Sequence, residues 1–545
     1  MRLWWLIFPA ALKLCAQGCG SVPAWSPCDF RFDLQPGEDV SRMELHVEFR
    51  SPHHQTFLMH AFHDDPQHLL VRFSPTESGT WTYRISSSAG RLDGLELSFI
   101  ATDSDSPGFI RTANVHHFQY QGNAKAHLWM ATAIDDFVKM PRAQFDALVA
   151  QRANEKFTHL RVTLEPSADL REAADRVKAI NARGMTADLV LASLPEDRQA
   201  RQAYLLEIVS RFDAMNITWM GVPAFENVAH AKRILKETGA QLKEIDPYDH
   251  PRTALASVTA GPLTGDDWMS LIDYGTPDPN VGAVEHQLYQ LPGINTGIKN
   301  ETDLWNATMN GQYPASGSGA YMTAWYEFMS GNRYWDLEPY FDLDGGRALA
   351  LPGVEYIIFI EKPGPVEVTL EKHGYDVAWL DPRTGELTKE KKGYNGEHFT
   401  GEPPDKSHPW VLHISRESTK ESMLRSWKFE SRPVPVQEVE QDPRHTPFEI
   451  TAPEAESAVS ISTPPYFDLK VTRDTRGTRS LLVEWVGEVY ADNEGYRVTG
   501  TGRQGTMHIP ESLADRLPAV LDVRVNVLNA NGKAYTLDKV YRLVP

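Results

Sequence analysis

The pattern that most restricts the fold begins at Ala126, where short apolar runs alternate strictly with longer amphipathic stretches. The apolar runs are HLWMATA, HLRVTLEP, TADLVLASLP and ITWMGVP, and the stretches between them include PRAQFDALVAQRANEKF and RQARQAYLLEIVSRFDAM. Strands alternating with helices indicate a parallel sheet with crossover helices. We expect closure into a (β/α)8 barrel, with some helices reduced because the segment is short for eight full units. An open doubly wound sheet is the alternative, although no glycine-rich phosphate-binding sequence follows the first strand.

Apolar residues alternate with period two on both sides of this segment. MELHVEF and TWTYRI show this pattern before it, and VEYIIFI, SLLVEWVGEVY and AVLDVRVNVLN show it afterwards. Such alternation, broken by turn residues, is typical of β-sandwiches. The chain of 545 residues therefore predicts a multidomain protein with an N-terminal β-sandwich, a central TIM-like barrel and two C-terminal β-sandwich domains. The expected boundaries are 1–24 (signal peptide), 25–120 (immunoglobulin-like sandwich), 121–343 (barrel), 344–417 (small β-domain) and 423–545 (C-terminal sandwich).

The N-terminus has the layout of a secretory signal. Arg2 precedes an apolar stretch from Leu3 to Leu12, and small residues follow around Ala16 and Ala24, either of which could precede a cleavage site. The apolar stretch is too short to span a bilayer. We therefore expect a secreted or periplasmic protein without a transmembrane segment.

The three cysteines restrict covalent chemistry. Lipid attachment at Cys19 is an alternative to free secretion, although the polar Gln17 makes a poor attachment sequence. Because Cys15 and Cys19 lie in or beside the signal, we expect Cys28 to be alone in the mature fold, with no intramolecular disulfide and no cysteine metal site.

The charge balance argues against nucleic acid as a partner. The sequence carries 54 basic and 73 acidic residues, a net charge of −19, and no basic cluster offsets the excess. Such a surface repels phosphate backbones and anionic membranes. The sequence does not define the oligomeric state.

Three segments resemble one family. LLVRFSPTESGTWTYRI and PGFIRTANVHHFQYQGN resemble the immunoglobulin-like domain that precedes apiosidase-like barrels in secreted bacterial proteins. The run from Ile217 to Glu301 resembles the substrate face of such a barrel, and the strands after Gly345 resemble its closing β-domain, which carries a collagen-binding label. The resemblance covers about Trp25 to Glu417. It implies hydrolysis of polysaccharide or glycan side chains by two carboxylates, without a metal or organic cofactor.

The sequence departs from the family where the two catalytic acids belong. Ala224 stands at the usual acid/base position and Gly297 at the usual nucleophile position, and neither side chain can transfer a proton. We expect Glu226 to act as the acid/base, with Glu301 or Asp246 as the second carboxylate. The alternative for Glu226 and Glu301 is an acid in the first turn of a helix, where it interacts favourably with the helix dipole.

The resemblance also suggests residues that hold the sugar. DPYDHPR would lie at the rim of strand five, Asp135 follows strand one, VGAVEHQLY follows strand six, and aromatic rings would stack on sugar C–H faces. The expected substrate-binding residues are Asp135, Tyr248, His250, Glu285, His286, Trp129, Trp268, Tyr289 and Trp305, with Tyr313 and Trp325 as further aromatic candidates. A polar loop cluster, solvated helix faces and core aromatics are the corresponding structural alternatives.

The remaining histidines suggest no metal site. The pairs His53–His54 and His116–His117 have no metal-ligand partner at a useful spacing in the sequence, and neighbouring side chains on a strand point to opposite faces. The sequence thus supports a carbohydrate partner and leaves two hypotheses for the function. One is an exported glycoside hydrolase, and the other is an inactive barrel that binds glycans or serves as a scaffold, because Ala224 and Gly297 replace the acids.

Overall fold

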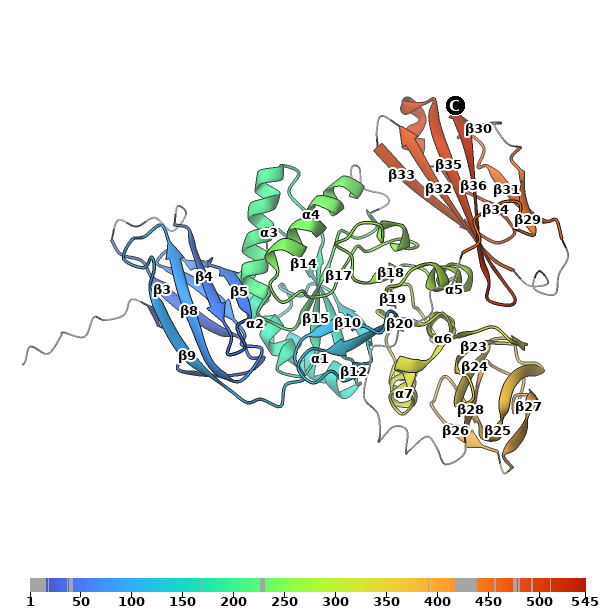
Figure 1. Cartoon of the computed structure of the whole chain (residues 1–545), viewed down its shortest axis with the longest axis horizontal. Coiled ribbons are helices and arrows are strands. Elements are labelled where there is room, and N and C mark those ends of the chain that lie inside the picture. The colour runs from blue at the N-terminus through green and yellow to red at the C-terminus, as the bar shows by residue number, and fades with distance from the viewer. Residues whose placement is uncertain are drawn as a thin grey trace, which may run out of the picture.

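A computed structural model describes residues 16–17, 19–36, 38, 43–166, 168–225, 231–390, 392–416, 439–454, 457–473, 478, 481–491, 494–509 and 511–545. The chain is multidomain and rich in strands. A β-body at the N-terminal end, a central α/β body and two further β-bodies follow one another along the chain (Figure 1). Within the described residues no helix is long and apolar enough to cross a membrane.

The N-terminal body consists of two sheets around an aromatic core. One sheet has the order β1 (Ala16–Gln17), β3 (Cys28–Asp33), β7 (His68–Phe73), β6 (Phe62–Asp65). The other has the order β2 (Ser21–Pro23), β9 (Glu96–Thr102), β8 (Gly79–Ser87), β4 (Leu45–Arg50), β5 (Thr56–His60). Alternate residues point inward, so Phe30, Phe49, Phe73 and Trp81 are buried together. The predicted β-sandwich is therefore present.

The start of this sandwich differs from the expected boundary at residue 25. β1 pairs with β3, and β2 pairs with β9 through Ser21 to Pro23, so residues before Trp25 belong to its sheets. Cys19 and Cys28 form a disulfide with a Cα–Cα distance of 6.4 Å. The expectation of no intramolecular disulfide was wrong, because it assigned Cys19 to the signal.

The central body alternates strands with helices in the predicted order. One parallel ladder contains β13 (Ala131–Ile134), β14 (His159–Leu164), β15 (Thr186–Leu191), β16 (Ile217–Met220) and β17 (Arg252–Thr253), and a second contains β18 (Ile272–Tyr274), β19 (Gly293–Asn295) and β20 (Gln312–Pro314). The helices are α1 (Arg142–Asn154), α2 (Leu170–Asn181), α3 (Arg198–Phe212), α4 (Ala231–Ile245), α5 (Pro279–Leu288), α6 (Glu301–Met309) and α7 (Ala320–Ser330). Between β17 and β18 the connection contains only the 3₁₀ helix η3 (Gly261–Leu263), so a helix is reduced at this point, as expected.

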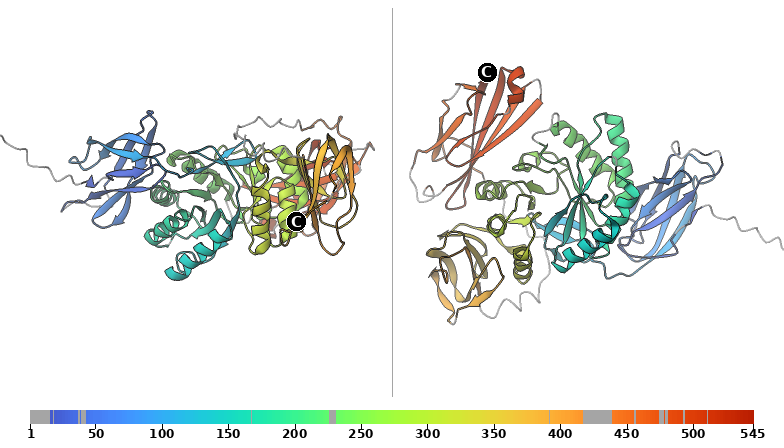
Figure 2. Two further views of the ribbon diagram at one scale, coloured as in Figure 1. Left: turned by 90° about the horizontal axis from the view of Figure 1, so that it is seen from below. Right: turned by 180° about the vertical axis from the view of Figure 1, so that it is seen from behind.

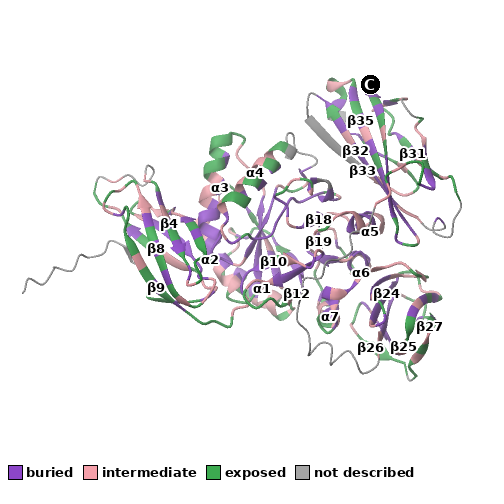
Figure 3. Ribbon diagram, in the orientation of Figure 1, coloured by how far each residue is buried: buried purple, intermediate pink, exposed green. Residues whose placement is uncertain are grey.

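Burial explains this layering. Every residue of β15 and β16 is buried, as parallel strands covered on both faces require. Figure 3 shows the ladder strands buried and outer faces of α3 and α4 exposed. A small antiparallel sheet lies against this core through β10 (Ile110–Ala113), β11 (His117–Tyr120) and β12 (Ala126–His127).

Two β-bodies follow at the other end of the molecule (Figure 2). The 3₁₀ helix η4 (Tyr334–Asp336) leads into a sheet of β21 (Glu338–Tyr340), β22 (Leu343–Asp344), β23 (Arg347–Leu351), β24 (Glu355–Ile360), β25 (Val366–Leu380), β26 (Leu387–Lys389), β27 (Tyr394–Gly401) and β28 (Trp410–Arg416). The last body pairs β29 (Phe448–Ala452), β31 (Tyr466–Val471) and β34 (Gln504–Thr506) in one sheet. Its other sheet contains β30 (Ala458–Ser460), β36 (Ala534–Val544), β35 (Ala519–Asn529), β32 (Leu481–Ala491) and β33 (Glu494–Thr501), with η6 (Glu511–Arg516) before β35.

Candidate functional site

In (β/α)8-barrel enzymes the catalytic residues lie at the carboxyl ends of the parallel strands. Ala224 lies beyond β16 with a φ of 47°, a left-handed conformation that is unfavourable for alanine. Gly297 lies beyond β19, and its amide donates to Asn295 Oδ1 at 2.9 Å. Neither position carries a titratable group.

The backbone around Gly297 leaves no room for a side chain. A methyl group there would lie 2.7 Å from the carbonyl carbon of Gly275 and closer still to its oxygen. Gly275 is equally crowded, since a methyl group on it would lie 2.5 Å from the carbonyl oxygen of Ser257 and closer to that of Ala256. The chain segments that follow β17, β18 and β19 thus touch backbone to backbone. A carboxylate could enter position 297 only if this packing opened.

The two nearby glutamates differ in how far the structure describes them. Glu226 lies outside the described residues. Glu301 is the first residue of α6, partly exposed, directly after the N-cap Asn300 whose Oδ1 accepts from the amide of Asp303. This is the helix-start environment considered as its structural alternative.

Asp246 lies near the amino end of β17, not at the carboxyl end where a catalytic acid was expected. It lies between α4 and the amino end of β17, is 4% exposed, and accepts from Trp219 Nε1 at 2.9 Å and from the amides of Tyr248 and His250. Burial by itself would raise the pKa of Asp246, but the charge and hydrogen bond of His250 and the hydrogen bond of Trp219 outweigh it and hold the pKa below its ordinary value. This carboxylate is fully engaged by the protein.

Tyr248 and His250 join the central body to the N-terminal sandwich. The Tyr248 hydroxyl donates to the Ser74 carbonyl and accepts from the Ser74 amide, and its ring packs with Phe57 and Phe73. His250 is completely buried against Phe109. These side chains, expected to bind sugar at the rim of strand five, instead fill the interface where the chain enters that strand.

Glu285 is also occupied internally. It is buried within α5, and Thr259 Oγ1 donates to its Oε2 at 2.5 Å. Burial, followed by the charges of Glu285 and of Glu484 from the last sandwich, raises the pKa of Tyr274 well above its ordinary value. The structure does not bring Asp246, Glu285 and Glu301 together, because each lies in a different set of contacts.

Most of the expected aromatic platforms belong to the core. Asp135 is exposed after β13 and remains accessible to a ligand. Five rings are at most 5% exposed and cannot stack on a sugar in this packing: Trp129, Trp268, Trp305, Tyr313 and Trp325. Trp129 stacks on His159 with centroids 3.6 Å apart. Only Tyr289 of the expected set keeps a partly exposed ring.

Tyr289 lines a cleft between the central body and the last sandwich. The Tyr289 cleft has a volume of about 400 Å³, within the size range of small-ligand sites. Its walls are formed by Thr264, Gly265, Tyr289, Val486, Glu488, Tyr490, Asp522, Arg524, Asn526 and Asp538. Tyr490 is 45% exposed and its hydroxyl donates to the Glu488 carboxylate. Arg524 Nε donates to Asp538 Oδ1 at 2.8 Å. An exposed ring beside several charged groups suits a sugar, which offers C–H faces and hydroxyls.

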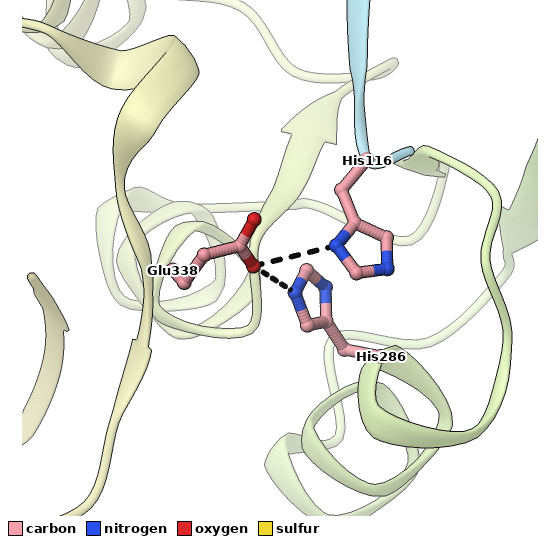
Figure 4. Close-up of side chains that lie close together, drawn as sticks. All are labelled: His116, His286 and Glu338. Atoms are coloured by element: carbon pink, nitrogen blue, oxygen red, sulfur yellow. Dashed lines mark hydrogen bonds and ion pairs between the residues drawn. The ribbon is translucent and has the colours of Figure 1, made fainter. Parts of the chain in front are cut away.

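Sequence reasoning missed a histidine–Glu338 cluster made by His116, His117, His286 and Glu338. His286 Nε2 lies 2.6 Å from Glu338 Oε2, and His116 Nδ1 lies 3.3 Å from the same oxygen (Figure 4). Burial, followed by the neighbouring His116, lowers the pKa of His286 to about 4. Burial alone would raise the pKa of Glu338, but its interactions with the imidazoles of His116, His117 and His286 hold it well below its ordinary value. The sequence pointed to His286 as a sugar-binding residue and to the adjacent histidines 116 and 117, but it did not connect them with one another or with Glu338.

Comparison with solved structures shows which class of fold this chain resembles. The solved structures that this chain resembles are glycoside hydrolase-like proteins. One from Bacteroides vulgatus, named “putative glycoside hydrolase”, is 15% identical with a TM-score of 0.64 and covers 73% of this chain and 100% of its own. A glycoside hydrolase family 5 protein from the same organism is 12% identical with a TM-score of 0.50, covering 59% and 96%. At these identities the likeness is one of fold.

The comparisons of sequence cover only a small part of the chain. Residues 21–88, which run through the first sandwich, match the family described as “Domain of unknown function (DUF5060)”. No curated protein matches the sequence.

Proposed function

We propose that this protein is an exported glycan-binding protein built on an apiosidase-like (β/α)8 barrel, and that it does not cleave glycosidic bonds by two-carboxylate chemistry. The observation that carries this proposal is the backbone contact between Gly275 and Gly297, which occupies the space of the expected nucleophile. A glycosidase needs two carboxyl groups flanking the scissile bond, about 5–10 Å apart. Asp246 and Glu285, which could have replaced the lost acids, are buried in internal contacts.

The glycan would bind in the Tyr289 cleft. Tyr289 and Tyr490 offer rings for stacking, and the Asp522, Arg524 and Asp538 side chains offer hydrogen-bond partners for hydroxyl groups. The central body and the last sandwich both contribute walls, which gives the C-terminal body a part in recognition. We propose the same domain boundaries as the sequence predicted, except that the first sandwich also includes β1 and β2.

Export fits the covalent structure. A disulfide between Cys19 and Cys28 persists in oxidising compartments such as the periplasm or the extracellular space. The same sulfur cannot carry a lipid, so the disulfide favours a secreted or periplasmic protein over one anchored at Cys19.

Affinity electrophoresis of the full chain through gels containing soluble plant and microbial polysaccharides tests the binding site. Tyr490→Ala should weaken retardation by roughly 2- to 13-fold, since an aromatic contact contributes about 0.5–1.5 kcal/mol. Tyr466→Ala is the matched control, because Tyr466 is 47% exposed on the other sheet of the same sandwich. Equal retardation of both variants in a polysaccharide that retards the wild type would place binding elsewhere.

A hydrolase remains the second candidate because Glu301 follows β19 on the carboxyl side and is partly exposed. It would pair with Glu226, whose side chain lies outside the described residues. Reducing ends should not accumulate when the wild type is incubated with the same polysaccharides over a range of pH. Release of sugar that falls roughly 10²- to 10⁴-fold in Glu301→Gln or Glu226→Gln would establish the hydrolase instead.

A further inference from the structure

We propose that His116, His286 and Glu338 form a binding site for one divalent transition-metal ion, with Zn²⁺ as the best chemical fit. Imidazole nitrogens and a carboxylate oxygen are the ligands that zinc takes in proteins. One donor atom from each residue lies within 4.8 Å of the others, so a single ion can reach all three. The three side chains converge from separate elements (Figure 4).

The spacing needs little adjustment for zinc. Ligand atoms of a tetrahedral site with bonds of roughly 2.0–2.1 Å lie about 3.3 Å apart. His116 Nδ1 and Glu338 Oε2 are already 3.3 Å apart. His286 Nε2 and the same oxygen are 2.6 Å apart and would separate by less than about 1 Å. The centroids of the His116 and His286 rings lie 3.8 Å apart, and the ring planes are tilted by 36°.

The hydrogen bonding of His116 points to a cation between the side chains. His116 Nε2 lies 3.1 Å from the backbone carbonyl oxygen of Tyr289, which can only accept, so Nε2 carries the hydrogen. In a neutral ring the lone pair of Nδ1 then faces the Glu338 carboxylate, although His116 is only 5% exposed and Nδ1 has no hydrogen-bond partner. Two facing lone pairs repel unless a proton or a metal ion lies between them. Histidines that bind metals commonly donate their other ring N–H to a backbone carbonyl in this way.

His117 supports the site from the other side of the carboxylate. Its Nδ1 lies 2.6 Å from the Tyr313 hydroxyl, and its Nε2 is buried without a hydrogen-bond partner, 3.8 Å from Glu338 Oε1. This nitrogen can either hold the carboxylate in position or complete the coordination. Glu338 itself keeps 33% of its side chain exposed, which gives an ion a route in from solvent.

The ion would join three parts of the chain that are distant in sequence. His116 precedes β11, His286 lies in the last turn of α5, and Glu338 begins β21, the first strand of the following β-body. A metal bond across these elements stabilises the native state because the unfolded chain has no such site. The expected role is structural, and it is independent of whether the protein binds or cleaves glycans.

Metal content and thermal unfolding of the full chain test the site. The protein, free of any histidine tag, is stripped with EDTA, mixed with ZnCl₂ and freed of excess ion by gel filtration. We expect about one zinc per chain by mass spectrometry, a raised Tm, and at least a 100-fold loss of affinity for Zn²⁺ in His286→Gln and Glu338→Gln. His373→Gln and Glu371→Gln are matched controls, because these residues form a partly exposed pair 3.8 Å apart in the same β-body as Glu338. Both controls should bind zinc like the wild type.

The result that overturns the proposal is a wild type that retains no more zinc than the His116→Gln/His286→Gln double variant and whose Tm does not respond to zinc. In that case a proton, and not a metal ion, lies between His116 and Glu338. If the variants fail to fold, X-ray absorption of the zinc-loaded wild type decides. Two imidazole ligands and oxygen support the site, and any other ligand set, such as one characteristic of surface histidines and water, rejects it.

Discussion

Single residues decide whether this fold can act as a glycosidase. Gly297 and Gly275 approach so closely that each excludes a Cβ, and Asp246 is saturated by hydrogen bonds from its own neighbours. Both effects are local, and both follow from side-chain size and backbone packing. A single substitution at Gly297 would therefore not restore a catalytic carboxylate, because the Gly275 backbone occupies the space that its side chain would need.

Gly297→Ala tests the backbone contact. The added methyl group would overlap the Gly275 carbonyl, so we expect a loss of about 1–3 kcal/mol in the free energy of unfolding, as in overpacked sites. Gly297→Glu should cost at least as much and should confer no hydrolysis. Gly265→Ala is the control, because a Cβ at residue 265 meets nothing within 4 Å. Urea denaturation measures the differences, and equal stability of Gly297→Ala and Gly265→Ala would contradict the contact.

Asp246→Asn tests whether this carboxylate is structural. Removing a buried charge from its partners should cost about 3 kcal/mol in unfolding free energy near neutral pH. Because the folded pKa of Asp246 is depressed, its ionised form stabilises the protein above the unfolded value of 3.8, and this contribution disappears as the pH falls through the lower folded value. The difference from wild type should therefore shrink in acid.

Asp249→Asn provides the comparison for this carboxylate. Asp249 also pairs with a cation, Arg252, at 2.8 Å, but its side chain is 79% exposed. An exposed pair contributes about 0–1 kcal/mol, so this variant should unfold close to the wild type in urea. A loss as large as that of Asp246→Asn would mean that burial does not set the difference.

At the scale of elements, helix ends explain residues that resemble catalytic groups. Glu301 stands in the first turn of α6, where a negative charge is favourable, and Asn300 caps the same helix. The turn between β10 and β11 likewise positions His116, with Asn114 and Val115 at φ values of 46° and 61°. An element boundary thus fixes which way each of these side chains points.

Asn300→Ala tests the assignment of this helix end. Loss of the hydrogen bond from the Asp303 amide should reduce the unfolding free energy by about 1 kcal/mol. Glu301→Gln should cost only a few tenths of a kcal/mol, through the helix dipole. Thermal unfolding followed by circular dichroism measures both, and an unchanged Tm for Asn300→Ala would show that α6 begins elsewhere.

At the scale of the whole molecule, the four bodies are joined by packed interfaces. Tyr248 anchors the central body in the core of the N-terminal sandwich, and α5 packs against the last sandwich through Ala283, Val284 and Leu528. The Tyr289 cleft and the histidine–Glu338 cluster both lie where bodies meet. Function in this protein is therefore expected at junctions between bodies.

The proposed export predicts where the mature chain begins, which is a test at the scale of the whole molecule. β2 pairs with β9 over Ser21–Pro23, and Cys19 is bonded to Cys28, so signal cleavage should occur before Cys19. Intact mass of protein secreted by a heterologous host should match a chain that begins at or near residue 17 and carries no free thiol. A mature chain beginning at Trp25 would lack β1 and β2 and would contradict the described sandwich.

The sequence by itself determined the order of elements. Period-two alternation predicted the sandwiches, and the strand–helix alternation after Ala126 predicted parallel strands with some helices reduced, because these patterns reflect which face of each element is buried. It also located Ala224 and Gly297 as departures from the pattern of the family that the sequence resembles. These are local properties of a chain.

Only the tertiary structure decided which residues meet. Tyr248 and His250 were placed at the wrong end of a strand, and most aromatic candidates proved to be core, because residue type does not report burial. Cys19 is bonded to Cys28, and His116 lies beside His286 and Glu338, although no spacing in the sequence indicated these contacts. The physical reason is that such contacts depend on how sheets and helices pack, and the sequence pattern specifies each element's buried face but not its neighbour.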